Sequence, residues 1–265
     1  MTLSSIPLLR PRFIGSVNGL GLLTMINKEI GRFTKAYLQT ILAPAISTLL
    51  FFAMFAFVLS GNHAGPSLGF LLPGIVMMTV AQNAFMNTSG SLVLSKVQGN
   101  IVDVLMPPLS SLELTLGYMV GGIVRGIVVG VTCLAFLFFF AHIEIHNMFF
   151  ILYHAVMGSM MLSLMGTITG IWADKFDNMI AVHSFVVLPL TILSGTFYTL
   201  SNLPENWRFI CTMNPFFYVI DGFRYGFIGA ADGNLGIGMV FVFVVNLGLL
   251  GATHHLFESG YKLKA

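Results

Sequence analysis

Six stretches of this sequence are apolar over about 20 residues, the length that a helix needs to cross the hydrocarbon core of a bilayer. They cover residues 38–59, 68–88, 116–141, 148–172, 179–199 and 235–257. Of the 265 residues, 56% are hydrophobic and only 8% are charged, whereas a soluble domain carries about 25% charged residues. We therefore expect an all-α integral membrane protein with six transmembrane helices.

The distribution of Lys and Arg predicts how these spans are oriented. An even number of spans places both termini on one side of the membrane, and basic loops stay in the cytoplasm. The side of the termini would carry Arg10, Arg12, Lys28, Arg32, Lys35, Lys96, Lys175, Lys262 and Lys264, and the other side Arg208 and Arg224. Both termini are therefore predicted to be cytoplasmic. The net charge of +2 is too small to suggest nucleic-acid binding.

Residues 1–37 form a separate segment before the first span, and residues 38–265 form the transmembrane domain. Within the first segment, apolar and basic residues occupy opposite helix faces. The apolar face holds Leu22, Ile26, Ile30, Phe33 and Tyr37, and the basic face holds Lys28, Arg32 and Lys35. This pattern predicts an amphipathic helix in the cytoplasmic interface, with its apolar face in acyl chains and its basic face towards headgroups or a partner. A plain membrane-surface anchor would show the same pattern.

Glycines recur every four residues in the third span, at Gly122, Gly126 and Gly130. Small residues let two helix backbones approach closely inside a membrane. The stripe predicts a tight helix–helix contact, either within the chain or with a second copy.

Arg125 lies inside the same span, about nine residues from the start of its apolar stretch. A charge within the membrane marks a functional site by default, although a long Arg side chain can also extend to the interface. Two roles remain open: a structural one, with a carboxylate partner or a place at the cytoplasmic mouth, and one in the translocation path.

Sequence motifs for catalysis are absent. The chain has no phosphate-binding G-x-x-x-x-G-K-[ST] loop, no H-E-x-x-H helix and no G-x-S-x-G turn. His142 and His146 are four residues apart but straddle a predicted loop, so we expect no metal site there. Asp174 and Asp177 flank Lys175 in a short turn that we interpret as solvated. We expect no catalytic residue and no cofactor in this chain.

The segment after the fifth span, "LSGTFYTLSNLPENWRFICTMNPFFYVIDGFRYGFIG" (193–229), is too polar to span and too aromatic for an ordinary loop. Irregular backbone at membrane depth survives only when protein covers it or when it lines a cavity. We predict a re-entrant pair of short helices at about 200–229, broken at Pro204 and at Asn214-Pro215. Asp221 and Arg224 are three residues apart and could form an ion pair, with either a structural or a substrate-binding role.

Two parts of this segment, "LSGTFYTLSNLP" (193–204) and "MNPFFYVIDGFRYG" (213–226), resemble the end of the membrane subunit of ABC-2 type exporters. The residues that match in order are Ser194, Gly195, Phe197, Tyr198, Leu203, Pro204, Asn214, Pro215, Asp221, Gly222 and Arg224. Thr199 stands where proline is common in the family. Together with "GYMVGGIVRG" (117–126), "SKVQGNIVDVLMPPLSSLEL" (95–114) looks closest to the YadH-like bacterial permeases within that family.

The resemblance implies a homodimer in the bacterial inner membrane, resting on two copies of a separate ABC ATPase subunit that holds ATP and Mg. It implies export of an amphiphile, glycan or drug from the cytoplasm. A coupling helix would lie in the loop at about 89–115 and dock onto the ATPase. The expected interface residues are Gly99, Asn100, Ile101, Asp103, Leu105 and Pro107, with Lys28 and Arg32. The expected translocation path or gate residues are Arg125, Tyr198, Asn214, Pro215, Asp221 and Arg224.

Rival functions leave different marks on a sequence. A secondary transporter driven by an ion gradient is the main alternative, but it would have midplane ionisable residues and internal repeats. The predicted spans offer Arg125, His154 and His183, and no repeat is visible. An intramembrane enzyme would need a clustered nucleophile or metal set. A membrane scaffold would not need the docking loop and the re-entrant segment.

Overall fold

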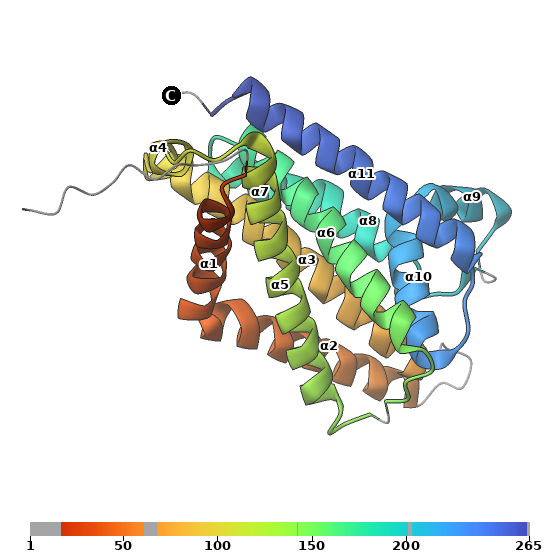
Figure 1. Cartoon of the computed structure of the whole chain (residues 1–265). Coiled ribbons are helices and arrows are strands. Elements are labelled where there is room, and N and C mark those ends of the chain that lie inside the picture. Colours follow the sequence, from red (N-terminus) through yellow and green to blue (C-terminus); the bar gives the residue numbers. More distant parts are fainter. Residues whose placement is uncertain (1–16, 61–67, 142, 201–202, 264–265) are drawn as a thin grey trace, which may run out of the picture.

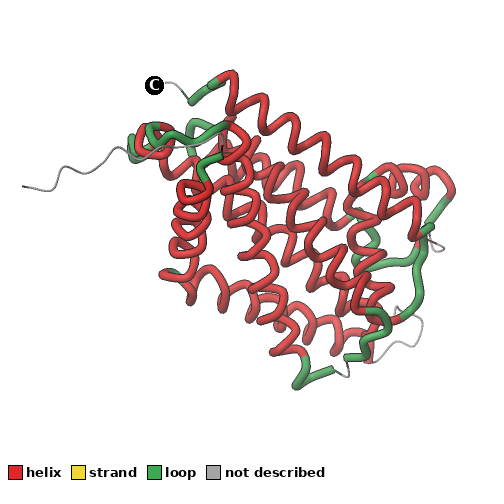
Figure 2. The backbone as a smooth tube through the Cα atoms, viewed as in Figure 1, coloured by secondary structure: helices red, strands yellow, loops and turns green. Residues whose placement is uncertain are grey.

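The computed structural model describes residues 17–60, 68–141, 143–200 and 203–263. Arg10, Arg12, His142 and Lys264 lie outside these residues. Within them, all regular structure is helical (Figure 2). The elements are α1 (Gly19–Lys35), η1 (Leu38–Leu42), α2 (Ala43–Ser60), α3 (Leu68–Val97), α4 (Ile101–Leu105), α5 (Ser111–Leu137), α6 (Met148–Trp172), α7 (Phe176–Val182), η2 (His183–Val187), α8 (Leu188–Ile192), α9 (Glu205–Met213), α10 (Pro215–Ile228) and α11 (Leu235–Ser259), where η1 and η2 are π-helical turns.

Five of the described helical segments are long and apolar enough to cross a membrane: Leu38–Val58, Leu68–Val97, Ser111–Leu137, Met148–Trp172 and Leu235–Ser259. The fifth expected span, 179–199, differs from the prediction. Its helix runs through α7, η2 and α8 from Phe176 to Ile192 and is shorter than 18 residues. The chain then turns at Gly195, whose φ of +75° is a conformation that glycine adopts without strain.

Helix caps explain why α5 begins at Ser111, five residues before the expected start at 116. Ser110 Oγ accepts a hydrogen bond from the Glu113 backbone N–H at 3.3 Å, and Glu113 Oε2 accepts one from the Ser110 N–H at 2.7 Å. Glu113 Oε1 also accepts from the N–H of Asn18, which ties the start of α1 to the start of α5. Because α5 starts earlier, Arg125 lies near the middle of this 27-residue helix rather than near one end.

The helices form one bundle with α3 at its centre (Figure 1). The apolar window of α3 is 72% buried, whereas the windows that represent α2 and α11 are each 17% buried, so those two helices lie at the outside. One end of the bundle, which we call the α4 end, holds α1, α4 and the end of α11. The opposite end, the α9 end, holds α9 and α10.

The glycine stripe of α5 lies against α3 and α6 of the same chain. A Cβ on Gly126 would come within 2.8 Å of Ser159 Oγ, and one on Gly130 within 2.5 Å of a Val80 methyl group. A Cβ on Gly122 would overlap the Ser163 hydroxyl. Each glycine therefore occupies a place where two helices approach too closely for a side chain.

Helix α1 packs against α5 along a strip of buried residues four apart, Met25, Glu29 and Phe33. The apolar face that the sequence predicted lies beside this strip, and Leu22, Ile26 and Ile30 are half-buried. A carboxylate at the centre of the packed face is not what an interfacial helix requires. It points instead to specific polar contacts with the bundle.

Candidate functional site

A cavity of about 600 Å³ opens between α1, α3 and the α4 loop, and we call it the coupling cleft. Its lining residues are Gly21, Thr24, Met25, Lys28, Arg32, Ser91, Leu94, Ser95, Gln98, Asn100, Asp103, Val104, Pro107 and Leu109. Lys28 and Arg32 come from α1, whereas Asn100, Asp103 and Pro107 come from the predicted coupling loop. The structure thus brings two distant sets of predicted interface residues around one cavity.

The short helix α4 presents a different face from the one that its sequence suggested. Gly99, with φ of +74°, turns the chain out of α3. Ile101 is 6% exposed and packs inside the bundle, and Leu105 is half-buried. The outward apolar residues are Val102 and Met106, which are 48% and 75% exposed. A partner at this end would therefore meet Val102 and Met106, beside the exposed Asp103, and not Ile101.

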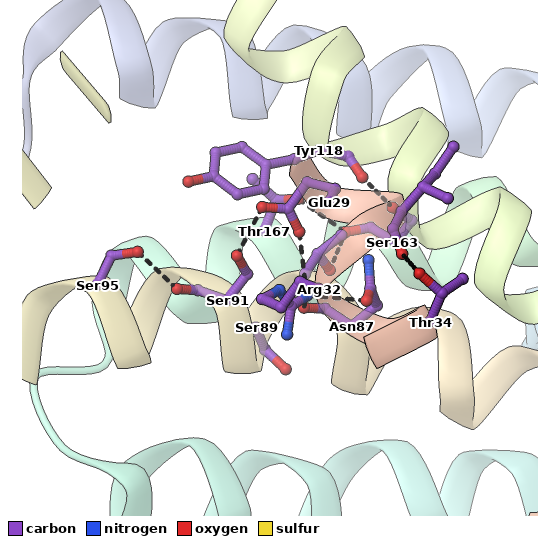
Figure 3. A network of polar contacts seen from close by, with 12 residues as sticks. Glu29, Arg32, Thr34, Asn87, Ser89, Ser91, Ser95, Tyr118, Ser163 and Thr167 are labelled. Atoms are coloured by element: carbon purple, nitrogen blue, oxygen red, sulfur yellow. Dashed lines mark hydrogen bonds and ion pairs between the residues drawn. The ribbon is translucent and has the colours of Figure 1, made fainter. Parts of the chain in front are cut away.

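A buried polar network joins α1 to α3 (Figure 3), and two of its members, Arg32 and Ser91, also line the coupling cleft. Glu29 is fully buried, and its carboxylate accepts hydrogen bonds from Ser91 Oγ at 2.7 Å and from Arg32 Nη2 at 3.0 Å. Arg32 Nη2 also donates to the backbone O and the Oδ1 of Asn87, at 2.7 and 2.8 Å. Arg32 was expected on the outer basic face of α1, and the structure turns it inward because Glu29 and Asn87 supply acceptors there.

Small polar residues run along α3 at four-residue spacing and connect this network to the membrane interior. The stripe consists of Thr79, Asn83, Asn87, Ser91 and Ser95. Consecutive members lie about one turn apart and are neighbours on the helix surface, so the stripe forms a continuous polar line that winds gradually round the helix. It was not recognised in the sequence, although its periodicity is visible there.

A second cavity, of about 670 Å³, lies between α2, α3 and the η2–α8 segment, and we call it the central cavity. It is lined by Pro44, Ser47, Thr48, Phe51, Phe55, Ile75, Met78, Thr79, Gln82, Asn83, Met86, His183, Leu188, Ile192 and Phe197. No Asp, Glu, Lys or Arg occurs among these described lining residues. This volume falls within the usual range of small-molecule sites, and hydrophobic and aromatic lining with a few polar groups is typical of them. Arg125 lies directly behind this wall, because its Nη2 donates to Asn83 Oδ1 at 3.2 Å.

At the α9 end, Asp221 and Arg224 bind separate backbone segments. The two oxygens of Asp221 accept hydrogen bonds from the backbone N–H groups of Asp232 and Gly233, each at 2.9 Å. Arg224 Nη2 donates to the carbonyl of Gly195 at 2.6 Å, and the guanidinium stands 3.6 Å from the centroid of the Phe70 ring. The Asp221–Arg224 ion pair considered from the sequence is not among the ion pairs of the described residues. The two side chains clamp different loops onto α10.

The other residues expected in a path or gate also hold the α9 end together. Asn214 donates through Nδ2 to the carbonyl of Leu190 at 2.8 Å, and its Oδ1 caps α10 by accepting from the Phe216 N–H at 3.1 Å. Pro215 occupies the first turn of α10, where a missing N–H costs nothing. The Tyr198 hydroxyl donates to the carbonyl of Leu193 at 2.6 Å. Asn214, Pro215 and Tyr198 do not line the central cavity.

Comparison with known proteins agrees with this architecture. The profile of the ABC-2 type transporter family matches residues 21–228. The chain is similar to the inner membrane transport permease YadH of Escherichia coli (strain K12), with 36% identity over 224 residues, which covers 82% of this chain and 88% of that protein. The YadH permease of Shigella flexneri shows the same identity and the same coverage. The chain therefore belongs to the ABC-2 type transporter family.

Proposed function

We propose that this chain is the membrane subunit of an ABC exporter in the bacterial inner membrane. It works as a homodimer with two copies of an ABC ATPase subunit, which binds ATP and Mg. The observation that carries the proposal is the connection between the two cavities. Asp103 of α4 lines the coupling cleft, the Glu29–Arg32 network ties α1 to α3, and α3 lines the central cavity.

The proposed topology has six spans with the α4 end in the cytoplasm. The helix from Phe176 to Ile192 crosses as the fifth span, and its length of about 25 Å is completed by the turn after Ile192 and by the re-entrant helices α9 and α10. Lysines support this orientation because they concentrate at one end of the bundle. The described lysines in or beside the elements at the α4 end are Lys28, Lys35, Lys96, Lys175 and Lys262.

A second copy of the chain would cover the open side of the central cavity. Ser47 is exposed, and Gln82 and His183 are half-buried, although they line a cavity at membrane depth. Polar groups that face lipid tails are costly, so such residues normally face protein or water. Apolar residues of α2 beside them, among them Leu50 and Met54, are exposed and supply contact area for the partner copy.

The mechanism follows from these contacts. ATP binding draws the two ATPase subunits together, and each of them carries the α4 helix docked upon it. The displacement passes to α3 through the side chains that join it to α1, and the walls of the central cavity shift with α3. Because cargo and ATPase bias the same two-state element, cargo binding stimulates hydrolysis and hydrolysis changes cargo affinity.

The test is co-purification of the chain with an ABC ATPase subunit encoded by the same genome. Replacing Val102 and Met106 together by Glu should abolish the association, because two carboxylates would have to be buried at the contact with the ATPase subunit. The matched control replaces Phe138 and Phe139 by Glu, since these residues are 68% and 80% exposed in the turn after α5.

Normal association and unchanged transport in the Val102→Glu/Met106→Glu variant would contradict the assignment of α4. Transport that persists without ATP but requires an ion gradient would contradict the exporter proposal itself and support a secondary transporter instead.

A further inference from the structure

Arg125 is buried with no compensating charge among the described residues. The buried Arg224 also lacks an ion pair, but its guanidinium donates to a backbone carbonyl and stacks over the Phe70 ring. Arg125 lies near the middle of a membrane-spanning helix and is 9% exposed. Within the described part of the chain, its hydrogen bond goes to the neutral amide of Asn83, and its Nε has no hydrogen-bond partner. No carboxylate of the described residues lies within ion-pair distance of it. By contrast, Arg32 has the Glu29 carboxylate at 3.0 Å.

An unpaired buried arginine lowers the stability of the fold, so a purely structural role does not explain it. A charge at membrane depth is normally paired or borders a polar path, and a buried unpaired charge strongly destabilises a fold. The amide oxygen of Asn83 offers Arg125 a partial negative charge where a structural site would place a carboxylate. The charge of Arg125 is therefore available to a negatively charged group from outside the chain.

The central cavity supplies the route to Arg125, because Asn83 contacts the guanidinium and also lines the cavity. The cavity is itself amphipathic along its length. Its polar residues lie nearer the α4 end, and its aromatic residues lie nearer the α9 end, as the chain order of α2, α3 and α8 requires. The polar set is Ser47, Thr48, Thr79, Gln82, Asn83 and His183, and the aromatic set is Phe51, Phe55 and Phe197.

We propose that the central cavity binds an amphiphile with one anionic head group, a carboxylate or a phosphate. The head group lies at Asn83 and replaces the amide oxygen as the acceptor for Arg125, while the apolar body packs against the three phenylalanines. The proposal rests on the exporter function proposed above and specifies its cargo class. It predicts discrimination against cationic amphiphiles, which meet Arg125 with like charge, and against neutral ones, which leave it uncompensated.

Direct binding to the full-length protein in nanodiscs of zwitterionic lipid tests this proposal without the ATPase. The probes are a dansyl-labelled undecanoic acid and its methyl ester, which differ in charge and share the same apolar body. The wild type should bind the acid roughly tenfold or more tightly than the ester, as expected for one desolvated charge-assisted contact. Dodecyl phosphate should displace the acid if phosphate head groups are also accepted, and failure to displace it restricts the class to carboxylates.

Three variants locate the effect. Arg125→Gln should lower the affinity for the acid to that for the ester and leave the ester affinity unchanged, which also shows that the cavity is intact. Asn83→Asp places a carboxylate beside Arg125, so it should raise the melting temperature and abolish the preference for the acid. Phe55→Ala should weaken both probes by the same factor, because it removes apolar contact and no charge.

Equal affinity of the wild type for both probes, or binding of neither, would overturn the proposed cargo class, as would a preference for the acid that survives in Arg125→Gln and Asn83→Asp alike. Should Arg125→Gln fail to fold, Asn83→Asp still decides the question, because it retains the arginine. These outcomes do not test the exporter proposal, which is tested separately by the association of the ATPase subunit through Val102 and Met106.

Discussion

The buried carboxylate that joins α1 to α3 at the α4 end and the charged residues of α10 at the α9 end bind different kinds of partner. At the α9 end, Asp221 and Arg224 each bind backbone groups of a loop. At the α4 end, Glu29 binds the side chains of Ser91 and Arg32. A backbone group is fixed by the path of the chain, so the first arrangement holds one conformation. Contacts between side chains of two helices can exchange partners when the helices shift, so the second arrangement suits the end that receives mechanical input.

The largest expected effect comes from a substitution at the α9 end. Arg224→Ala leaves the Gly195 carbonyl without its charged donor and empties a fully buried site against Phe70. We expect it to lower the free energy of unfolding by about 3–5 kcal/mol. The measurement is thermal unfolding of the detergent-solubilised full chain, with Ile228→Ala, at a residue 39% exposed, as the control on the same helix. A loss no greater than that of the control would show that the clamp does not stabilise this end.

The second prediction tests the contact between Glu29 and Arg32 at the α4 end. Glu29→Gln keeps the shape of the side chain but leaves Arg32 without a buried counter-charge, at a cost of about 2–3 kcal/mol. Its functional effect should exceed its effect on stability. ATP hydrolysis by the assembled complex should become independent of the membrane subunit, although the ATPase still binds through α4. Glu258→Gln is the matched control, because the carboxylate of Glu258 is exposed at the same end of the bundle.

If hydrolysis in the Glu29→Gln complex still depends on the membrane subunit as in the wild type, the Glu29–Arg32 network does not transmit the motion of the ATPase. The network would then be a structural contact equivalent to the clamps at the α9 end.

The third prediction concerns the glycine stripe of α5, the helix that connects the two ends of the bundle and packs closely against α3 and α6. Gly122→Ala forces a methyl group onto the Ser163 hydroxyl and should cost about 1–3 kcal/mol. Gly248→Ala in α11 is the matched control, because among the described residues nothing beyond the adjacent backbone of its own helix lies within 4 Å of the added methyl group. It should leave stability unchanged or raise it by up to about 1 kcal/mol. Equal melting temperatures for the two variants would mean that α5 can shift to accommodate the methyl group.

Local patterns in the sequence predicted local structure well. Apolar length located five membrane-spanning helices, and Pro107 marked the end of α4. Hydropathy missed the true start of α5, although the Ser110–Glu113 capping pattern was legible beside it. In α4, five residues are too few for periodicity to choose a face, so Val102 and Met106 could not be distinguished from Ile101 and Leu105.

The parts of the site that sequence could not provide depend on contacts between distant segments. Arg32 and Asn87 are 55 residues apart, and Arg125 and Asn83 are 42 apart. No local pattern states that an arginine will meet an amide instead of a carboxylate. The central cavity likewise lies between α2, α3 and the η2–α8 segment, and a space between helices leaves no pattern in the sequence of any one of them.

The smallest expected effect concerns a surface contact at the α4 end, where Lys262 donates to Asp174 Oδ2 at 2.9 Å and to the Trp172 carbonyl at 3.0 Å. The hydrogen bond from Lys262 lowers the pKa of Asp174 below its ordinary value. A lowered pKa means that the contact stabilises the folded chain at pH values above the unfolded pKa of about 3.9, and that this contribution disappears as the pH falls through the folded value. Lys262→Gln should therefore lower the melting temperature slightly at neutral pH, and the difference from wild type should shrink as the pH falls below about 3.9. Lys175→Gln, in the neighbouring turn, should show no such pH-dependent difference. A Lys262→Gln difference that is constant across this range would instead assign the effect to the bond with the Trp172 carbonyl. The α4 end would then hold a further stabilising contact between a charged side chain and the backbone, besides the one between Glu113 and the Asn18 N–H.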